Sequence, residues 1–330
     1  MFSHAQDDYY AIINPMNKES FEDYFEHTNM DYPVGVYYMD LDGMYMRRVR
    51  AHWHPEMEID LVREGSAVFS IGGETFTVNA GNAVWINQDR LHMIHPADPG
   101  VSTVILSILF HPAYLFEQND SFLATKYCEP LKNNEGLSHL ILSRDDEYGV
   151  RALENINTIL ETNLKLSFGY ELETKSRLCA LWLQLLEKSS RIDFDTDKVS
   201  QATIDETRVK KALIYMHSAF SSKVTLDMIS DSIHVSKSEC CRCFKRSLGM
   251  SPFDLLLEQR IYEAARRLQR SEKKTESMQD LAMATGFPNP SYFNRIFKKF
   301  LDCTPREYRE YIKKGHRDAL NPYGIPLTRL

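Results

Sequence analysis

An internal duplication in the last third of the chain limits what it can fold into more than any other feature. A short amphipathic segment, a turn and a longer amphipathic segment occupy 225–248, and the same order returns over 277–300. Equivalent residues lie 52 positions apart before the turn and 53 after it, as Arg242 and Arg295 do. The pattern predicts two helix-turn-helix units with the same fold.

The longer segment of each copy predicts a helix with a basic outer face. Phe244 and Phe297 belong to the apolar stripes, whereas Arg242 and Arg295 point outward. Such helices suit the major groove of DNA, because arginine can bind guanine through two nitrogens and Asn294 can read adenine. The residues expected to contact DNA lie along these helices and at their first turns: Ser236, Lys237, Ser238, Glu239, Cys241, Arg242, Lys245, Arg246, Asn289, Pro290, Ser291, Tyr292, Asn294, Arg295, Lys298 and Lys299.

Between the two copies, Pro252–Leu268 has apolar residues at continuous helical spacing. We expect this rigid connector to place the two helices in successive major grooves, about 34 Å apart. The charge agrees with a nucleic-acid partner, because 201–330 contains 23 Lys and Arg against 15 Asp and Glu. The first 200 residues contain 16 basic against 31 acidic residues, so the basic character is confined to the second part.

The acidic part of the chain predicts a β-rich region followed by helices. Short β-rich runs with glycine turns between them, such as Gly72-Gly73, are typical of an antiparallel sandwich or barrel. The expected strands are Glu58–Val62, Ala67–Ile71, Thr75–Val78, Ala83–Ile86 and Val101–Phe110. Helical spacing then predicts helices over Val150–Asn163 and Tyr170–Glu187, and the polar stretch after Lys188 predicts a linker.

Histidines and carboxylates gather in the β-rich region. In an extended segment His52, His54 and Glu58 share one face, because side chains alternate along a strand. Imidazole and carboxylate donors suit divalent transition metals, but the same groups can line a pocket for a polar molecule. We expect His52, His54, Glu58 and His92 to bind a small-molecule ligand, with no metal and no catalytic residue.

The repeated region resembles the AraC/XylS family of bacterial transcription regulators. The similarity rests on 225–252 and above all on GFPNPSYFNRIFKKF, followed by Thr304-Pro305. One residue departs from the pattern, because Asp302 replaces the glycine that usually follows the second reading helix. The first copy keeps this glycine as Gly249.

The β-rich region resembles the cupin barrel. The pattern HxH-x3-E-x6-G runs from His52 to Gly65, and a second signature with two substitutions runs from Gly81 to His92. In metal-bearing cupins the positions of His52, His54, Glu58 and His92 hold a divalent metal. Sensor domains of the AraC type commonly resemble cupins and use the barrel as a small-molecule pocket, and this is the use that we expect here.

The two resemblances together imply an α+β multidomain chain, with a cupin-like antiparallel β-barrel plus helices and an all-α double helix-turn-helix domain. The expected parts are a ligand-sensing barrel with an N-terminal arm over 1–112, a helical dimerisation and connector region over 113–190, a linker over 191–207, a double helix-turn-helix DNA-binding domain over 208–314, and a tail over 315–330.

The implied function is sequence-specific regulation of transcription in response to a sugar or related metabolite. Expected partners are double-stranded promoter DNA, the effector, a second copy of the chain in a homodimer, and RNA polymerase. No apolar run reaches the roughly 18 residues that a spanning helix needs, so we expect no membrane partner and a cytoplasmic location. We expect no cofactor, and we interpret Cys240, Cys241 and Cys243 as packing residues.

Two other functions fit parts of the sequence. A metal-dependent cupin enzyme, a dioxygenase or isomerase, would use the histidines for catalysis and keep the helix-turn-helix domain as an accessory. A structural protein that coats DNA would bind every sequence equally. We favour the regulator, which needs no catalytic chemistry.

Overall fold

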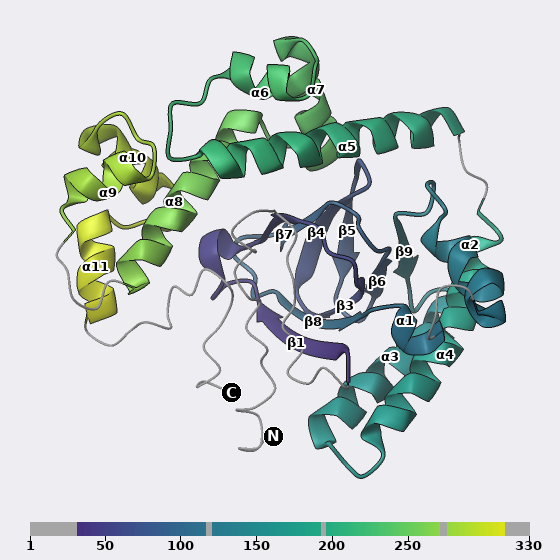
Figure 1. The fold of residues 1–330 in the computed structure, drawn as a ribbon. Coiled ribbons are helices and arrows are strands. Elements are labelled where there is room, and N and C mark those ends of the chain that lie inside the picture. The colour runs from purple at the N-terminus through teal and green to yellow at the C-terminus, as the bar shows by residue number, and fades with distance from the viewer. Residues whose placement is uncertain (1–31, 117–120, 193–195, 271–275, 314–330) are drawn as a thin grey trace.

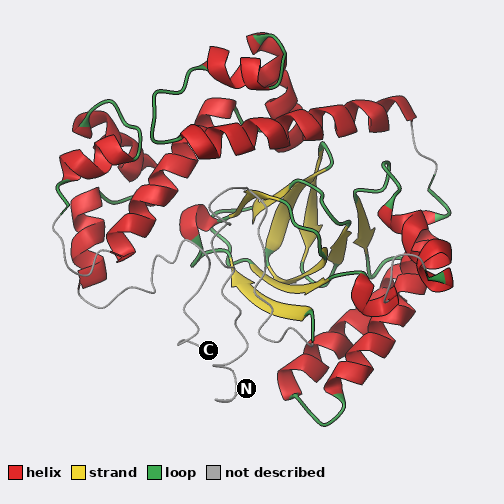
Figure 2. Cartoon of the chain, in the orientation of Figure 1, coloured by secondary structure: helices red, strands yellow, loops and turns green. Residues whose placement is uncertain are grey.

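The computed structural model describes residues 32–116, 121–192, 196–270 and 276–313. The expected N-terminal arm before Tyr32 and the expected tail over 315–330 lie outside the described residues. Figure 2 shows that the strands gather in the first part of the chain and that the rest is helical. The α+β multidomain fold predicted from the sequence is therefore confirmed.

The strands form two antiparallel sheets that face each other. One sheet has the order β1-β8-β3-β6-β9, and the other has the order β2-β7-β4-β5. Their bounds are β1 Val34–Asp40, β2 Val49–His52, β3 Met57–Glu64, β4 Ser66–Ile71, β5 Glu74–Asn79, β6 Ala83–Ile86, β7 His92–Pro96, β8 Val104–Phe110 and β9 His139–Leu142. Apolar residues of both sheets, such as Val62, Phe69 and Ile94, share one core. The described strands thus form two open sheets packed face to face, not one closed barrel.

The sequence predicted five of these strands and missed β1, β2, β7 and β9. The predicted hairpin is present, because Gly72 and Gly73 have φ values of 59° and 80° between β4 and β5. The strands β2 and β7 contain arginine, histidine and proline in place of a β-branched run. Their pairing depends on burial between the sheet and the helices, which local propensity does not express.

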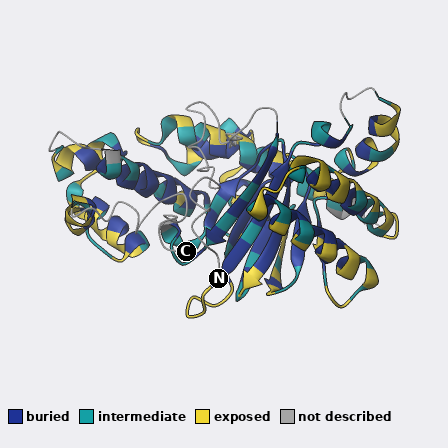
Figure 3. Ribbon diagram, turned by 90° about the horizontal axis from the view of Figure 1, so that it is seen from below, coloured by how far each residue is buried: buried dark blue, intermediate teal, exposed yellow. Residues whose placement is uncertain are grey.

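Helices cover the outer face of the five-stranded sheet, as Figures 1 and 3 show. The two long helices α3 (Glu147–Lys165) and α4 (Tyr170–Ser189) agree with the predicted ones, and Asp146 caps α3 by accepting from the Gly149 amide. Short segments precede them: η1 (Tyr45–Arg47), α1 (Ala113–Phe116), η2 (Ala124–Cys128) and α2 (Glu129–Lys132). Apolar residues of α3 and α4, among them Ile156 and Trp182, pack against the sheet in one cluster.

The predicted linker over 191–207 is wrong for most of its length. Helix α5 runs from Thr196 to Ala219 without a break. Acidic side chains usually lie on the surface, so this polar stretch looked like a linker. Asp205 and Glu206 are instead buried, and each forms an ion pair with an arginine. The rest of the helix packs through Val209 and Leu213.

The last part of the chain has the predicted repeat. The first unit contains α6 (Leu226–Ser232) and α7 (Lys237–Leu248), and the second contains α9 (Met278–Ala284) and α10 (Pro290–Leu301). Helix α8 (Pro252–Arg270) connects them as predicted, and α11 (Pro305–Lys313) follows. None of the helices within the described residues is both long enough and apolar enough to cross a membrane.

The β-rich region and the helical region share a buried interface. Helix α5 lies across the four-stranded sheet in Figure 1. Four residues of the β-rich region join the apolar cluster formed by α5, α6, α7 and α8: Ala51 in β2, Trp53 just after it, Leu91 just before β7 and Met93 in β7. The two regions are thus held together by packing as well as by ion pairs.

Candidate functional site

The helices α7 and α10 begin with the caps that their sequences predict. The Ser236 hydroxyl accepts from the Glu239 amide at 3.2 Å, and the Asn289 side chain accepts from the Tyr292 amide at 2.8 Å. The cores of these helices are also as predicted, because Phe244 and Phe297 are fully buried. The opposite faces are therefore the ones presented outward.

Most of the predicted DNA-contacting residues are exposed. The exposed ones are Ser236, Lys237, Ser238, Arg242, Lys245, Arg246, Asn289, Ser291, Asn294, Arg295, Lys298 and Lys299. Glu239, Cys241, Pro290 and Tyr292 are partly buried. Both helices thus carry basic side chains, and α10 also carries Asn294, in positions that a DNA groove can reach.

An ion-pair network that sequence patterns did not predict holds part of α7. Arg246 contacts Asp205 of α5 at 2.6 Å and Glu239 at 2.7 Å, and Arg242 also contacts Glu239 at 2.6 Å. Hydrogen bonds from Arg246 and Arg242 lower the pKa of Glu239 to about 2. Arg246 therefore joins α7 to α5. Its position on the outer face of α7 had predicted only a contact with DNA.

Two of the three cysteines of α7 pack in its core, and Cys241 is partly buried. Cys240 and Cys243 are fully buried, and burial raises the pKa of both thiols to about 11. Asp205, Glu239 and Cys243 lie close enough to hold a metal ion. The guanidinium of Arg246 already contacts both carboxylates, so the group is an ion-pair network.

The predicted ligand residues of the β-rich region do come together. His52, His54, Glu58 and His92 are all buried, and their ligand atoms lie within 4.8 Å of one another. His54 Nε2 is 3.1 Å from Glu58 Oε2, and His92 Nε2 is 3.0 Å from the same oxygen. Residues from β2, β3, β7 and the turn after β2 thus meet at one buried point.

The ring nitrogens of the three histidines are oriented by backbone carbonyls. The Nδ1 atoms of His52 and His92 lie 2.8 Å from the carbonyl oxygens of Arg50 and Arg90, and His54 Nδ1 lies 3.1 Å from that of Glu56. A carbonyl oxygen only accepts, so each Nδ1 carries the proton. In the neutral ring Nε2 then presents a lone pair to the cluster.

Glu58 faces two of these Nε2 atoms. Burial opposes ionisation, but the facing His92 and the contacts with His54 outweigh it and hold the pKa of Glu58 well below its usual range. Burial lowers the pKa of His52 well below its ordinary value, so this ring is neutral near pH 7. Burial, together with the charge of Glu58, raises the pKa of the neighbouring Asp60, and Ser107 donates to it.

The donor set fits a divalent transition metal. His54 and His92 could donate to Glu58 through Nε2 only as imidazolium ions, because each Nδ1 proton is already bound to a carbonyl. A bound cation would instead be held by the Nε2 lone pairs of the three rings and by the Glu58 carboxylate. The Nδ1-to-carbonyl bonds are also the outer contacts that orient metal-binding histidines.

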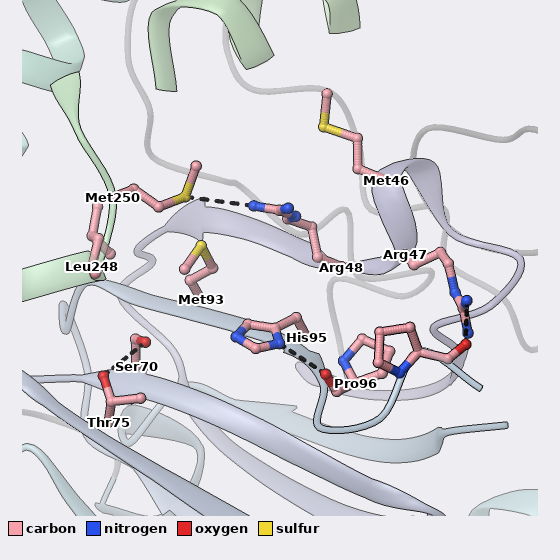
Figure 4. A pocket seen from close by; sticks show the side chains of 12 residues that line it. Met46, Arg47, Arg48, Ser70, Thr75, Met93, His95, Pro96, Leu248 and Met250 are labelled. Carbon is pink, nitrogen blue, oxygen red and sulfur yellow. Dashed lines mark hydrogen bonds between the residues drawn. The ribbon is translucent and has the colours of Figure 1, made fainter. Parts of the chain in front are cut away.

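Two pockets lie where the β-rich region meets the helices. One, of about 460 Å³, is lined by Arg48, Ser70, Thr75 and His95 and by residues at the end of α7 (Figure 4). Another, of about 860 Å³, lies between the β4–β5 turn, β9, α5 and α7. Both volumes are in the range of small-molecule sites, which is about 300–1,000 Å³.

Comparison with known proteins agrees with both halves of the chain. The AraC-like ligand binding domain matches residues 34–181, and a helix-turn-helix domain matches residues 229–311. The transcriptional regulator YdeC of Bacillus subtilis is 26% identical over 285 residues, which cover 86% of this chain and 94% of that protein. The transcriptional activator RhaS of Escherichia fergusonii is 23% identical over 263 residues, covering 78% and 87%. A structure of ToxT from Vibrio cholerae with bound unsaturated fatty acid has a TM-score of 0.41 at 16% identity, covering 87% and 98%.

Proposed function

Because this chain belongs to the AraC/XylS family of DNA-binding transcription regulators, we propose that it recognises promoter DNA through α7 and α10 together. The curated relatives are regulators of transcription, so the chain is a regulator and not a metal-dependent cupin enzyme. The observation that supports the proposal most directly is that both helices expose basic side chains, to which α10 adds Asn294, while Phe244 and Phe297 are buried on the opposite faces.

The exposed residues divide by position. Arg242, Asn294 and Arg295 lie in the part of each helix that would enter the groove, and we assign them to base edges. Lys298 and Lys299 lie in the last turn of α10, and we assign them to phosphates. We assign Arg246 to the joint with α5, because it is held by two carboxylates.

Selection of binding sites from random double-stranded DNA tests this function with the full-length protein. We expect an enriched site whose two halves lie about one helical turn apart. Competition with unselected DNA at fixed salt should show a preference of at least about a thousandfold. Equal binding of selected and unselected DNA would instead support a protein that coats DNA.

The effector that we propose first is a polar metabolite such as a sugar. Figure 4 supports a place for it, because Ser70 and Thr75 offer hydroxyls while Arg48 and His95 offer nitrogens beside Met250 of the helical region. In the present arrangement the side chains of the four-residue cluster contact one another too closely to enclose a sugar. The ligand role predicted for His52, His54, Glu58 and His92 therefore suits a single ion better.

A second candidate effector is a divalent transition-metal ion at this four-residue cluster. The three Nδ1-bound carbonyls, which direct the Nε2 atoms toward Glu58, favour it. When bound, the ion would supply a fixed positive charge in a buried place and hold β2, β3 and β7 together. This role needs no turnover of a substrate.

Calorimetry with tag-free, EDTA-treated protein separates the two candidates. Zn²⁺, Ni²⁺ and Mn²⁺ are titrated one by one, and a panel of sugars and sugar acids is titrated separately. Binding of one ion per chain that His92→Ala abolishes would support the metal. Binding of a sugar that Thr75→Val weakens, with no ion bound, would support the metabolite in the pocket of Figure 4.

The remaining partners follow from the family and from exposed surfaces. We propose a homodimer through α4, because Leu172 and Leu183 lie on one exposed face of this helix, 74% and 59% accessible. Sedimentation of wild-type protein and of Leu172→Glu tests the dimer.

We propose activation of transcription with RNA polymerase as a partner, since several relatives are named activators. A promoter-binding protein must meet DNA, so we place it in the cytoplasm.

A further inference from the structure

The histidine cluster lies directly behind the surface that holds the helical region. Along β2 and along β7, successive side chains point alternately into the histidine cluster and toward the helical region. His52 and His92 point into the cluster, whereas their neighbours Trp53 and Met93 belong to the apolar core shared with α5. A change on one side of these strands is therefore only one residue away from the joint with the DNA-binding helices.

One polar link leaves the cluster through Arg50. His52 Nδ1 donates to the Arg50 carbonyl at 2.8 Å. The Arg50 side chain reaches α8, where Nε is 3.3 Å from Glu258, and its guanidinium lies 4.2 Å from the ring centre of Tyr262. Gln259 accepts a further hydrogen bond from it. We name this path from His52 to α8 the Arg50 link.

A second link with the same plan leaves through Arg90. His92 Nδ1 donates to the Arg90 carbonyl at 2.8 Å. The Arg90 side chain lies 3.4 Å from Glu206 of α5, and Glu206 also accepts from the Leu91 amide at 2.7 Å. Lys210 contacts the same carboxylate at 2.9 Å. We name this path from His92 to α5 the Arg90 link.

The two links converge on one point of the cluster. His52 and His92 are direct partners in the β2–β7 ladder, and their rings lie 4.1 Å apart. We propose that the Arg50 and Arg90 links transmit the occupancy of the four-residue cluster to the two helices that position the DNA-reading units. The inference rests on the proposed metal site, and it assigns to Arg50 and Arg90 a positioning role that neither ligand binding nor DNA contact requires.

Burial explains why the links would carry a change between the regions. The Glu258 side chain is 1% exposed, and the Arg48 and Arg50 guanidinium groups provide its positive partners. A buried carboxylate that loses such a partner is costly, so α8 must follow a shift of Arg50 or break the pair. Helix α8 connects both reading units, and α5 packs on α7. Small changes at the histidines can thus alter how both units are held.

Hydrogen exchange of the full-length, tag-free protein with Zn²⁺ or with EDTA tests the proposal. In wild-type protein we expect Zn²⁺ to slow exchange of amides in α5 and α8 by about fivefold, at the lower end of usual coupling energies. The double variant Arg50→Met/Arg90→Met removes both guanidinium groups but keeps the carbonyls that orient His52 and His92. It should bind Zn²⁺ within about threefold of wild type and lose the change in α5 and α8.

Arg63→Met is the matched control, because Arg63 is an exposed arginine of β3. It should keep both Zn²⁺ binding and the exchange change. If Arg50→Met/Arg90→Met does not fold, Glu206→Gln/Glu258→Gln interrupts the same links from the helical side without changing side-chain size, and the same loss is expected. Zn²⁺ binding with an unchanged effect on α5 and α8 in either double variant would overturn the links alone. Absence of Zn²⁺ binding to wild type would overturn the metal site and the links with it.

Discussion

The two helix-turn-helix units have the same fold but different surroundings. Both reading helices start at a polar cap and bury a phenylalanine at the same position, Phe244 or Phe297. Both end in the left-handed conformation, at Gly249 with φ 68° and at Asp302 with φ 56°. The repeat therefore determines each unit by itself, down to the backbone of its last turn.

The difference lies in what each reading helix contacts. Helix α7 packs on α5 and on β4 and β5, and its arginines share Glu239. Helix α10 has no acidic residue in its first turn, its Arg295 lies over the Tyr292 ring, and it meets the β-rich region at η1. Helix α10 thus has fewer internal partners for its basic side chains, while α7 is the reading helix that is tied more closely to α5 and to the four-stranded sheet.

Removing the anchor of α7 should give the largest effect. Asp205→Ala takes away the buried partner of Arg246 and the nearer acceptor of the Cys243 thiol. We expect the free energy of unfolding to fall by about 2–3 kcal/mol, measured by urea denaturation. Asp227→Ala, which removes an exposed partner of Lys237 in the same unit, is the control and should leave stability unchanged. Similar losses in both variants would mean that the network does not distinguish α7.

The two arginines that face DNA should differ in their contribution to specificity. Arg295→Ala should cost about 1–3 kcal/mol on the selected site and relax preference at one base pair. Arg242→Ala should cost less than about 1 kcal/mol, because its guanidinium must first leave Glu239. Titrations on the selected site and on single-base variants measure both. A larger loss for Arg242→Ala would reverse the assignment of the main reader.

The residues that end α7 and α10, Gly249 and Asp302, can each be replaced by the other's residue type. Asp302→Gly should stabilise the second unit by about 0.5–1 kcal/mol, because glycine adopts positive φ without strain. Gly249→Asp should destabilise the first unit by a similar amount, since nothing lies within 4 Å of an added Cβ and only the backbone is strained. Thermal unfolding of both variants provides the values. Opposite signs would show that the Asp302 side chain makes a favourable contact of its own.

The smallest expected effect is a dependence on pH that comes from Glu239 of the first unit. The pKa of Glu239 is lowered from 4.5 to about 2 by Arg246 and Arg242. Its contribution to stability is therefore complete above pH 4.5 and is lost as pH falls toward 2. The difference in urea midpoint between wild type and Glu239→Gln should shrink across this range. A constant difference from pH 6 to pH 3 would show that the pairs contribute nothing.

Much of the candidate site could be predicted from local patterns. The helices α7, α8 and α10 and the strands β3 to β6 follow from residue spacing, and the members of the four-residue cluster follow from the cupin signatures. The extended segment expected from His52 to Glu58 is wrong, because the chain turns between β2 and β3. The roles of Arg246 and Asp205 could not be predicted, because a buried ion pair looks like two surface charges until the contacts of both residues are known. The first part of helix α5 resembles a linker in sequence for the same reason.

Local sequence is sufficient for the elements whose stabilising contacts lie within a few residues, which are the caps, the amphipathic stripes, the hairpin turn and the repeat that they build. Long-range packing settles which histidines and carboxylates meet in the cluster and which carboxylates are buried. Glu258 and Arg50 lie 208 positions apart, yet their side chains form a hydrogen bond. Local patterns do not encode such pairs, because their energies depend on burial that forms only when distant segments meet.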